Sequence, residues 1–311
     1  MSRTSTALLG VAGAAAAGLA WSVAEAHRYT LRRREAAVLP AGQPRLRVLH
    51  ISDLHLTPRH QGRVEWVRRL AALDPDLVVV TGDFLAHREA VPTVMDALDP
   101  LLDRPGLFVL GSNDYYEPGV VRPWRYLTAP SALDKQRPLL PWGDLVKGLS
   151  SAGWLDLSNA RGTVEAGGRH LDVRGVDDPH IHRDRYDEVA GPFDASADLA
   201  LGVTHAPYLR ILDAMADDGA DLVLAGHTHG GQLCIPGYGA IITNCDLPPA
   251  QATGISRHAR PWNGAGDPSF GGADGRGTVL HVSAGLGTSP YAPVRFACPP
   301  EATLLTLTAV D

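Results

Sequence analysis

Short apolar runs recur along the chain without the polar alternation that marks half-exposed strands. Five of them cover residues 45–51, 76–80, 106–110, 198–203 and 222–225. Continuous runs of this length, rich in β-branched residues, are typical of strands covered on both faces. The pattern therefore predicts five buried strands.

Helical spacing appears between these strands. Val64, Val67 and Leu70 recur every three residues, and residues 94–101 and 207–218 carry apolar positions at helix-compatible spacing. Strands that alternate with helices predict an α/β domain.

A second group of strands is predicted late in the chain. A hairpin is expected over residues 163–173, with Gly167 and Gly168 at its turn. Strands over residues 279–283 and 303–309 are expected to complete a second sheet.

Side chains that bind metals follow each of the five runs. In chain order they are Asp53 and His55, then Asp83, then Asn113 and Asp114, then His205, and finally His227 and His229. Sites in α/β sheets form beyond the carboxyl ends of strands, and imidazole and carboxylate groups hold divalent transition metals. A lone aspartate here would more often be a helix N-cap, and a lone histidine a packed residue. Because the residues recur together, the sequence predicts a metal centre along one sheet edge.

This joint pattern resembles the calcineurin-like metallophosphoesterases, and within them the membrane-associated bacterial branch. The resemblance runs from about Leu46 onward and rests on Gly226-His-Thr-His-Gly-Gly-Gln232, Gly285-Leu-Gly-Thr-Ser289, Arg295-Phe296 and Pro299-Pro-Glu301. It implies a four-layer α-β-β-α sandwich of two mixed sheets, preceded here by an apolar N-terminal helix.

The resemblance also implies a set of ligands for two divalent metal ions. Asp53, His55 and His229 would hold one ion, and Asp83 would bridge both. The second ion would be held by His205, His227 and an amide oxygen from the third run. Mixed oxygen and nitrogen ligands suit Mn, Fe or Zn. In this family a hydroxide that bridges the two ions attacks phosphorus, which makes Asp83 a catalytic residue as well as a ligand.

The third motif departs from the family pattern. The family has Gly-Asn-His followed by an acidic residue, whereas this chain has Gly111-Ser112-Asn113-Asp114. We predict Asn113 as the metal ligand and a catalytic-site residue, with Ser112 as the alternative in ungapped register. The usual imidazole is missing in both registers, so slower turnover is expected for esters with poor leaving groups. Asp114 is the candidate residue to replace it, with a metal-bound water as the alternative, although a plain helix cap is the favoured interpretation of Asp114.

The predicted function is therefore that of a binuclear-metal phosphohydrolase acting on a phosphate ester or pyrophosphate. The related membrane branch includes enzymes that look like UDP-diacylglucosamine pyrophosphohydrolases, so a phosphorylated small molecule or a lipid-linked substrate is expected. The altered third motif leaves another interpretation open, in which the protein is a catalytically weakened metal-binding sensor or scaffold at the membrane.

The N-terminus differs in composition from the rest of the chain. Residues 4–24 are uncharged and rich in alanine, and their 21 residues match the thickness of a bilayer core. We predict that residues 1–44 form a membrane anchor or signal segment plus a linker over 36–44, and that residues 45–311 form the metallophosphoesterase domain.

Charge sets the expected location and partners. Five arginines against two glutamates give residues 1–38 a charge of +3, although the whole chain carries −6. Arginines that follow the apolar segment place the catalytic domain on the cytoplasmic side of the cell membrane. A cleaved signal peptide, for which Ala24-Glu25-Ala26 has the right form, would export it instead. The net negative charge argues against a nucleic-acid partner.

Two further features are predicted to be structural. The three cysteines, Cys234, Cys245 and Cys298, are too few for a disulfide framework. A Cys234–Cys245 pair stays open, but a buried thiol is the favoured state of Cys234. The segment Asp177-Asp-Pro-His180 is predicted to be a turn and not a set of ligands.

Overall fold

A computed structural model describes residues 3–119, 136–258, 277–288 and 290–310 of the protein. The α-helices are α1 (Arg3–Glu25), α2 (Gln61–Arg68), α3 (Val91–Leu98), α4 (Ser112–Tyr115), α5 (Trp142–Ser151) and α6 (Leu209–Asp217). The first six strands are β1 (Thr30–Leu39), β2 (Leu46–Ile51), β3 (Leu77–Thr81), β4 (Gly106–Val109), β5 (Leu155–Asp156) and β6 (Ala160–Ala166). The others are β7 (Arg169–Gly175), β8 (Leu199–Val203), β9 (Leu222–Ala225), β10 (Gly254–His258), β11 (Thr278–Val282) and β12 (Glu301–Ala309).

The strands form two mixed sheets of six strands each. The first has the order β1-β12-β2-β3-β4-β5, in which β2 to β5 run parallel and β12 is antiparallel to β2. The second has the order β10-β11-β9-β8-β7-β6, with parallel strands in its centre and an antiparallel strand at each edge. All five predicted buried strands are confirmed, because β2, β3, β4, β8 and β9 begin and end within one residue of the expected bounds.

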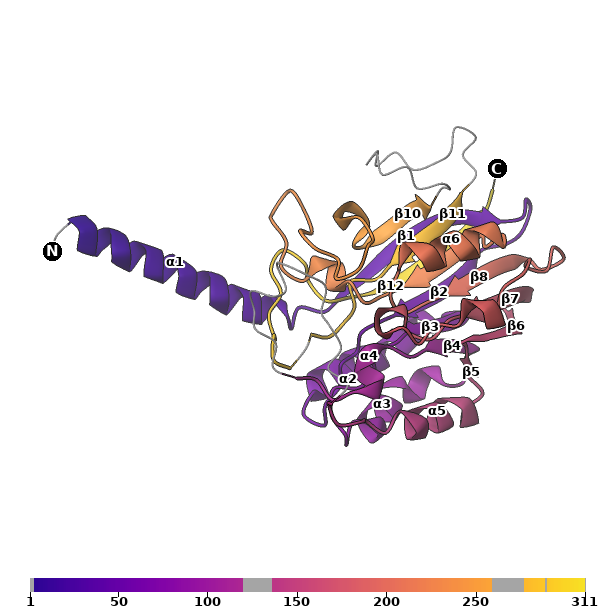
Figure 1. Ribbon diagram of the computed structural model, residues 1–311, viewed down its shortest axis with the longest axis horizontal. Coiled ribbons are helices and arrows are strands. Elements are labelled where there is room, and N and C mark those ends of the chain that lie inside the picture. Colours follow the sequence, from indigo (N-terminus) through magenta and orange to yellow (C-terminus); the bar gives the residue numbers. More distant parts are fainter. Residues whose placement is uncertain (1–2, 120–135, 259–276, 289, 311) are drawn as a thin grey trace.

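Three apolar clusters show how the layers pack. Alternate residues of β2 and β3, such as Val48 and Val79, lie between the sheets against Leu201 and Leu224. The outer face of the first sheet packs on α2, α3 and α5, and that of the second packs on α6. The domain is thus a sandwich of helices, two sheets and a further helix, as seen in Figure 1. These strands read as unbroken apolar runs because both of their faces are buried.

Strand β1 corrects the expected organisation near the N-terminus. Residues 30–39 pair in parallel with β12, so Ala36 and Leu39, placed by the sequence in a linker, lie buried in the first sheet. Residues 33–35 are exposed charges on this edge strand, which is a common protection of sheet edges. The arginines of β1 therefore looked like the positively charged residues that follow a membrane anchor, although they belong to a strand.

Strand β12 is a second correction. We expected residues 303–309 in the second sheet, but β12 lies between β1 and β2 in the first. β12 pairs with β2 over a long sequence separation, with Leu305 opposite Val48. The residues of a strand do not by themselves specify which sheet the strand joins.

Helix α1 projects from the body of the domain (Figure 1). None of the helices in the described part of the chain combines the length and the hydropathy needed to cross a bilayer. The carboxyl end of α1 is anchored through the buried Glu25. Its carboxylate accepts hydrogen bonds from the amides of Ala297 and Cys298 at 3.1 and 2.8 Å. The helix is thereby tied to the loop that precedes β12.

Candidate metal centre

The predicted ligands converge at the carboxyl ends of strands from both sheets. These side chains form two groups, and within each group the ligand atoms all lie within 4.8 Å of one another. One group is Asp53, His55 and His229, and the other is Asp53, Asp83 and His205. The sequence separation between Asp53 and His229 is 176 positions in the printed numbering, so only the fold brings them together.

Asp83 lies among the imidazoles of both groups. Its Oδ2 atom is 3.4 Å from Nε2 of His55 and 3.6 Å from Nε2 of His205. Asp53 Oδ1 is 3.7 Å from Nε2 of His229. Asp53 is the carboxylate that the two groups share, whereas the family pattern gives the bridging position to Asp83. Asp83 Oδ2 lies near one histidine of each group, but the role of Asp83 as the ligand that bridges two ions stays a prediction.

The residues present fit divalent cations. Among the described residues, Asp53 Oδ1 and His205 Nε2 are buried polar atoms without a hydrogen-bond partner. Such atoms are costly unless something satisfies them. A mixed set of carboxylate oxygens and imidazole nitrogens would bind Mn, Fe or Zn.

The electrostatics of the cluster also favour a cation. Burial lowers the pKa of His55 to about 4, and it holds the pKa of His229 well below the usual range. These rings are therefore neutral at pH 7, which is the form that binds metals. For His205, burial is outweighed by the carboxylates of Asp83, Asp178 and Asp53, which raise its pKa to about 9. The carboxylates thus stabilise positive charge at this point of the site.

Strained backbone accompanies the ligands. Asp53, His55, Asp83, His227 and His229 all have positive φ, between 41° and 69°. Residues other than glycine rarely adopt this region, and such strain concentrates at functional sites. The positive φ values therefore mark the loops that carry the predicted ligands as strained segments.

Two glycines allow the loops to approach the centre closely. A Cβ on Gly226 would collide with the hydroxyl of Ser52, and one on Gly285 would lie 2.6 Å from Cβ of Asp53. The amide of Leu286 donates to the Ser52 carbonyl at 3.0 Å. The late glycine motif therefore packs around Asp53, although its last residue, Ser289, lies outside the described residues.

In the third motif, Asn113 donates two hydrogen bonds to the Asp83 carboxylate. Its amide N–H donates to Asp83 Oδ1 at 2.8 Å, and its side-chain Nδ2 donates to Oδ2 at 2.7 Å. The Ser112 hydroxyl accepts from Nδ2 of Asn113 at 3.5 Å. The Asn113 side chain therefore lies beside Asp83, and its role as a metal ligand stays a prediction.

Asp114 caps helix α4, as one of its two interpretations predicted, and its catalytic role stays a prediction. Its fully buried carboxylate accepts hydrogen bonds from the amides of Asp83, Phe84, Leu85 and Gly111 at 2.7–3.0 Å. Because backbone amides occupy both of its oxygens, Asp114 is a positioning residue. It fixes the loop that carries Asp83.

Hydrogen bonds to the second ring nitrogen orient two of the histidines. Nδ1 of His205 donates to the carbonyl of Thr81 at 2.7 Å, which leaves Nε2 facing Asp83. Nε2 of His227 contacts the Asn244 carbonyl at 3.2 Å. The His227 ring lies 5.2 Å from that of His205, centre to centre, but its nitrogens fall outside both ligand groups.

A buried arginine holds the His229 loop, and no structural role was predicted for it. Arg295 is fully buried, and its Nη2 atom donates to the carbonyls of Ala284, Gly285 and Gly287 at 2.7, 3.1 and 2.8 Å. Its Nη1 atom donates to the carbonyl of His229 at 3.2 Å. One guanidinium thus links two loops that carry the site.

The segment expected to be a plain turn lies beside the site. It does form a turn, in which the Asp178 carboxylate accepts from the His180 amide at 2.8 Å. Asp178 is fully buried, and its Oδ2 has no hydrogen-bond partner within the described ranges. The His180 ring lies 4.5 Å from that of His227. The predicted turn is confirmed, and because it follows β7, which neighbours β8, it lies at the same edge of the sheet as the predicted ligands.

Comparisons with known proteins agree with this geometry. A sequence profile described as calcineurin-like phosphoesterase matches residues 46–231. The chain belongs to the calcineurin-like phosphoesterase family.

Among its relatives is the uncharacterized protein YpbG of Bacillus subtilis, 26% identical over 86% of this chain and 82% of its own. An uncharacterized metallophosphoesterase of Aquifex aeolicus is 28% identical, and the match covers 90% of both chains. A transmembrane protein with metallophosphoesterase domain from Bos taurus is 28% identical over 63% of this chain and 43% of its own length.

Proposed function

We propose that the protein is a binuclear-metal phosphohydrolase that cleaves a phosphate ester or pyrophosphate bond. The observation that supports this most strongly is the pair of ligand groups that share Asp53. In the proposed arrangement Asp53, His55 and His229 would hold one ion, and Asp83 would be a ligand of both. Asn113, His205 and His227 would hold the second ion.

When bound, two such ions would provide a hydroxide nucleophile near neutral pH and offset the charge on the phosphoryl oxygens. The protein's own residues supply position. Asn113 orients both oxygens of Asp83, and Asp114 holds the loop that carries it. Arg295 keeps the His229 loop against the late glycine motif.

The third motif supports a preference among leaving groups. An asparagine amide, unlike an imidazolium, does not donate a proton to a departing oxygen at neutral pH. We therefore propose substrates whose leaving groups need little protonation, such as a pyrophosphate or an activated ester of a phosphorylated small molecule.

A lipid-linked substrate is the more specific form of this proposal. Leu19, Trp21 and Val23 of α1 are exposed apolar side chains, and they would suit contact with a membrane surface. The N-terminal segment would then bring the domain to substrates held there.

The test combines metal analysis with hydrolysis of an aryl phosphodiester in Mn²⁺. We expect about two metal ions per chain together with turnover. Asp83→Asn should abolish hydrolysis while the protein stays folded, and Asp103→Asn, a change at an exposed aspartate, serves as the matched control. Bound metal without turnover on aryl, alkyl and pyrophosphate substrates would instead support the sensor or scaffold role. A protein that binds no metal would overturn both.

A further inference from the structure

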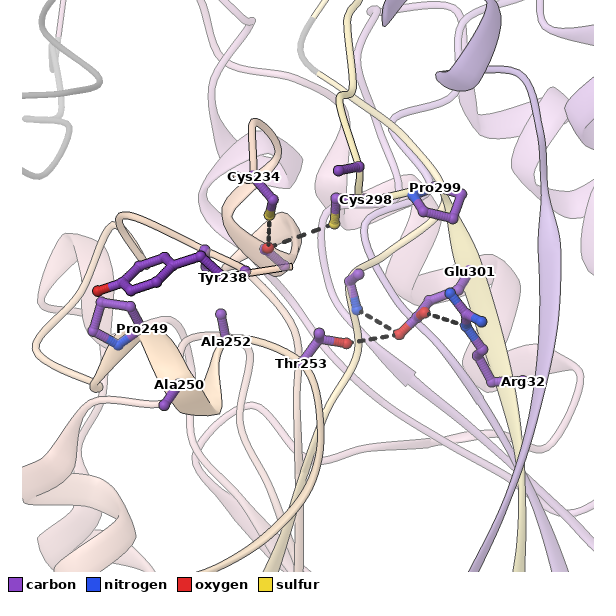
Figure 2. A pocket seen from close by; sticks show the side chains of 15 residues that line it. Arg32, Cys234, Tyr238, Pro249, Ala250, Ala252, Thr253, Cys298, Pro299 and Glu301 are labelled. Atoms are coloured by element: carbon purple, nitrogen blue, oxygen red, sulfur yellow. Dashed lines mark hydrogen bonds and ion pairs between the residues drawn. The ribbon is translucent and has the colours of Figure 1, made fainter. Parts of the chain in front are cut away.

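Two thiols lie against the turn that carries His229. Cys234 donates from Sγ to the carbonyl oxygen of Gly230 at 3.1 Å, and Cys298 contacts the same oxygen at 3.5 Å. The Cys298 thiol also donates to the His229 carbonyl at 3.3 Å. Figure 2 shows both sulfurs pointing at one backbone oxygen. The two thiols therefore share one hydrogen-bond acceptor.

A cavity gives small molecules access to this pair. Its volume is about 380 Å³, and both cysteines line it together with Arg32, Tyr238 and Glu301. Each cysteine is only 7% exposed, so the cavity is the approach route to the sulfurs. Much of the remaining wall of the cavity consists of alanine and proline. These residues have no nucleophilic group that would compete with the thiols. The Nη1 atom of Arg295 lies 3.9 Å from the Cys298 sulfur, and a neighbouring cation favours thiol reactivity.

We propose that Cys234 and Cys298 form a disulfide when the protein meets a low-molecular-weight disulfide, and that this bond weakens metal binding at His229. One cysteine thiolate attacks the small disulfide, which gives a mixed disulfide and releases one small thiol. The second cysteine then displaces the other small thiol. The protein loses two electrons and two protons, which reduce the small disulfide to two thiols.

The link to the metal centre follows from the hydrogen bonds that oxidation removes. A disulfide has no S–H donor, so the Gly230 carbonyl loses both thiol contacts and the His229 carbonyl loses one. Cys298 also packs tightly on the turn, because a Cβ on Gly230 would lie 2.6 Å from its sulfur. Drawing the sulfurs together therefore shifts the turn that aims His229. This part of the inference rests on the proposed function, since it requires a cation at His229.

The experiment treats the full-length protein with oxidised glutathione and then measures thiols and metal binding separately. A thiol count in denaturant should fall from three to one, since the chain has three cysteines. Peptide mapping should show Cys234 linked to Cys298. Calorimetric titration with Mn²⁺ should show affinity about tenfold lower for the oxidised protein, recovered after reduction. Cys245→Ser, the control, should behave like the wild type. Cys234→Ser and Cys298→Ser should each show no change in Mn²⁺ affinity on oxidation.

The outcomes separate this inference from the proposed function. If the reduced protein binds Mn²⁺ but keeps three thiols after oxidation, or if Cys245 is in the bond, the disulfide is refuted. If the bond forms and Mn²⁺ affinity stays the same, the coupling to His229 is refuted. If the reduced protein binds no Mn²⁺, the proposed function fails, and the thiol count still tests the disulfide.

Discussion

Removing the Asp114 carboxylate is the sharpest test of how the site is positioned. In Asp114→Ala, the amides of Asp83, Phe84, Leu85 and Gly111 lose their acceptor inside the protein. A buried donor left unsatisfied costs about 1–3 kcal/mol. Water entering the space left by the carboxylate offsets part of that loss. We therefore expect the free energy of unfolding to fall by about 4 kcal/mol, a large share of the 5–15 kcal/mol that is usual for domains.

Urea denaturation followed by tryptophan fluorescence measures this loss for the metal-free protein. The matched control is Asp103→Ala, a change at an exposed aspartate, which should shift the free energy by no more than about 0.5 kcal/mol. Mn²⁺ binding by the folded Asp114→Ala protein should also weaken, because the Asp83 loop is no longer fixed. A loss of stability below about 1 kcal/mol would refute the assignment of Asp114 as the residue that holds this loop.

Two other predictions concern the close packing around Gly226 and the protonation of His205. Gly226→Ala should destabilise the protein by about 1–3 kcal/mol through the collision with Ser52. Gly143→Ala, in open space on α5, should be neutral or slightly stabilising in the same thermal melts, and equal effects would contradict the argument. Because the pKa of His205 is raised to about 9, the metal-free ring is protonated at pH 7.5 and loses its proton when metal binds. Calorimetry in buffers of different ionisation enthalpy should then show about one proton released, with Mn²⁺ affinity rising as pH rises toward 9. Affinity that does not change from pH 7 to 9 would show that the ring is already neutral.

The parts of the fold that could be predicted from the sequence are those whose signal is local. Strands β2, β3 and β8 are buried on both faces and therefore appear as unbroken apolar runs. Strand β1 has no such run, because residues 33–35 are charged and lie on an exposed edge. The place of β12 depends on pairing with residues more than 250 positions away, which its own pattern does not contain.

The site divides in a similar way. Asp53, Asp83 and His205 were identifiable because each follows a buried strand and has a metal-binding side chain. Asp178 also follows a strand, but its segment was predicted to be a turn, and only the folded structure shows that its Oδ2 has no hydrogen-bond partner among the described residues. The guanidinium of Arg295 acts through backbone carbonyls, which have no signature in a sequence.

The most direct test of the central claim is anomalous diffraction from crystals of the protein grown with Mn²⁺. We predict two manganese peaks about 3.5–4 Å apart, with Asp83 or Asp53 between them and with His55, His205 and His229 as ligands. A single peak, or two peaks away from these side chains, would contradict the account.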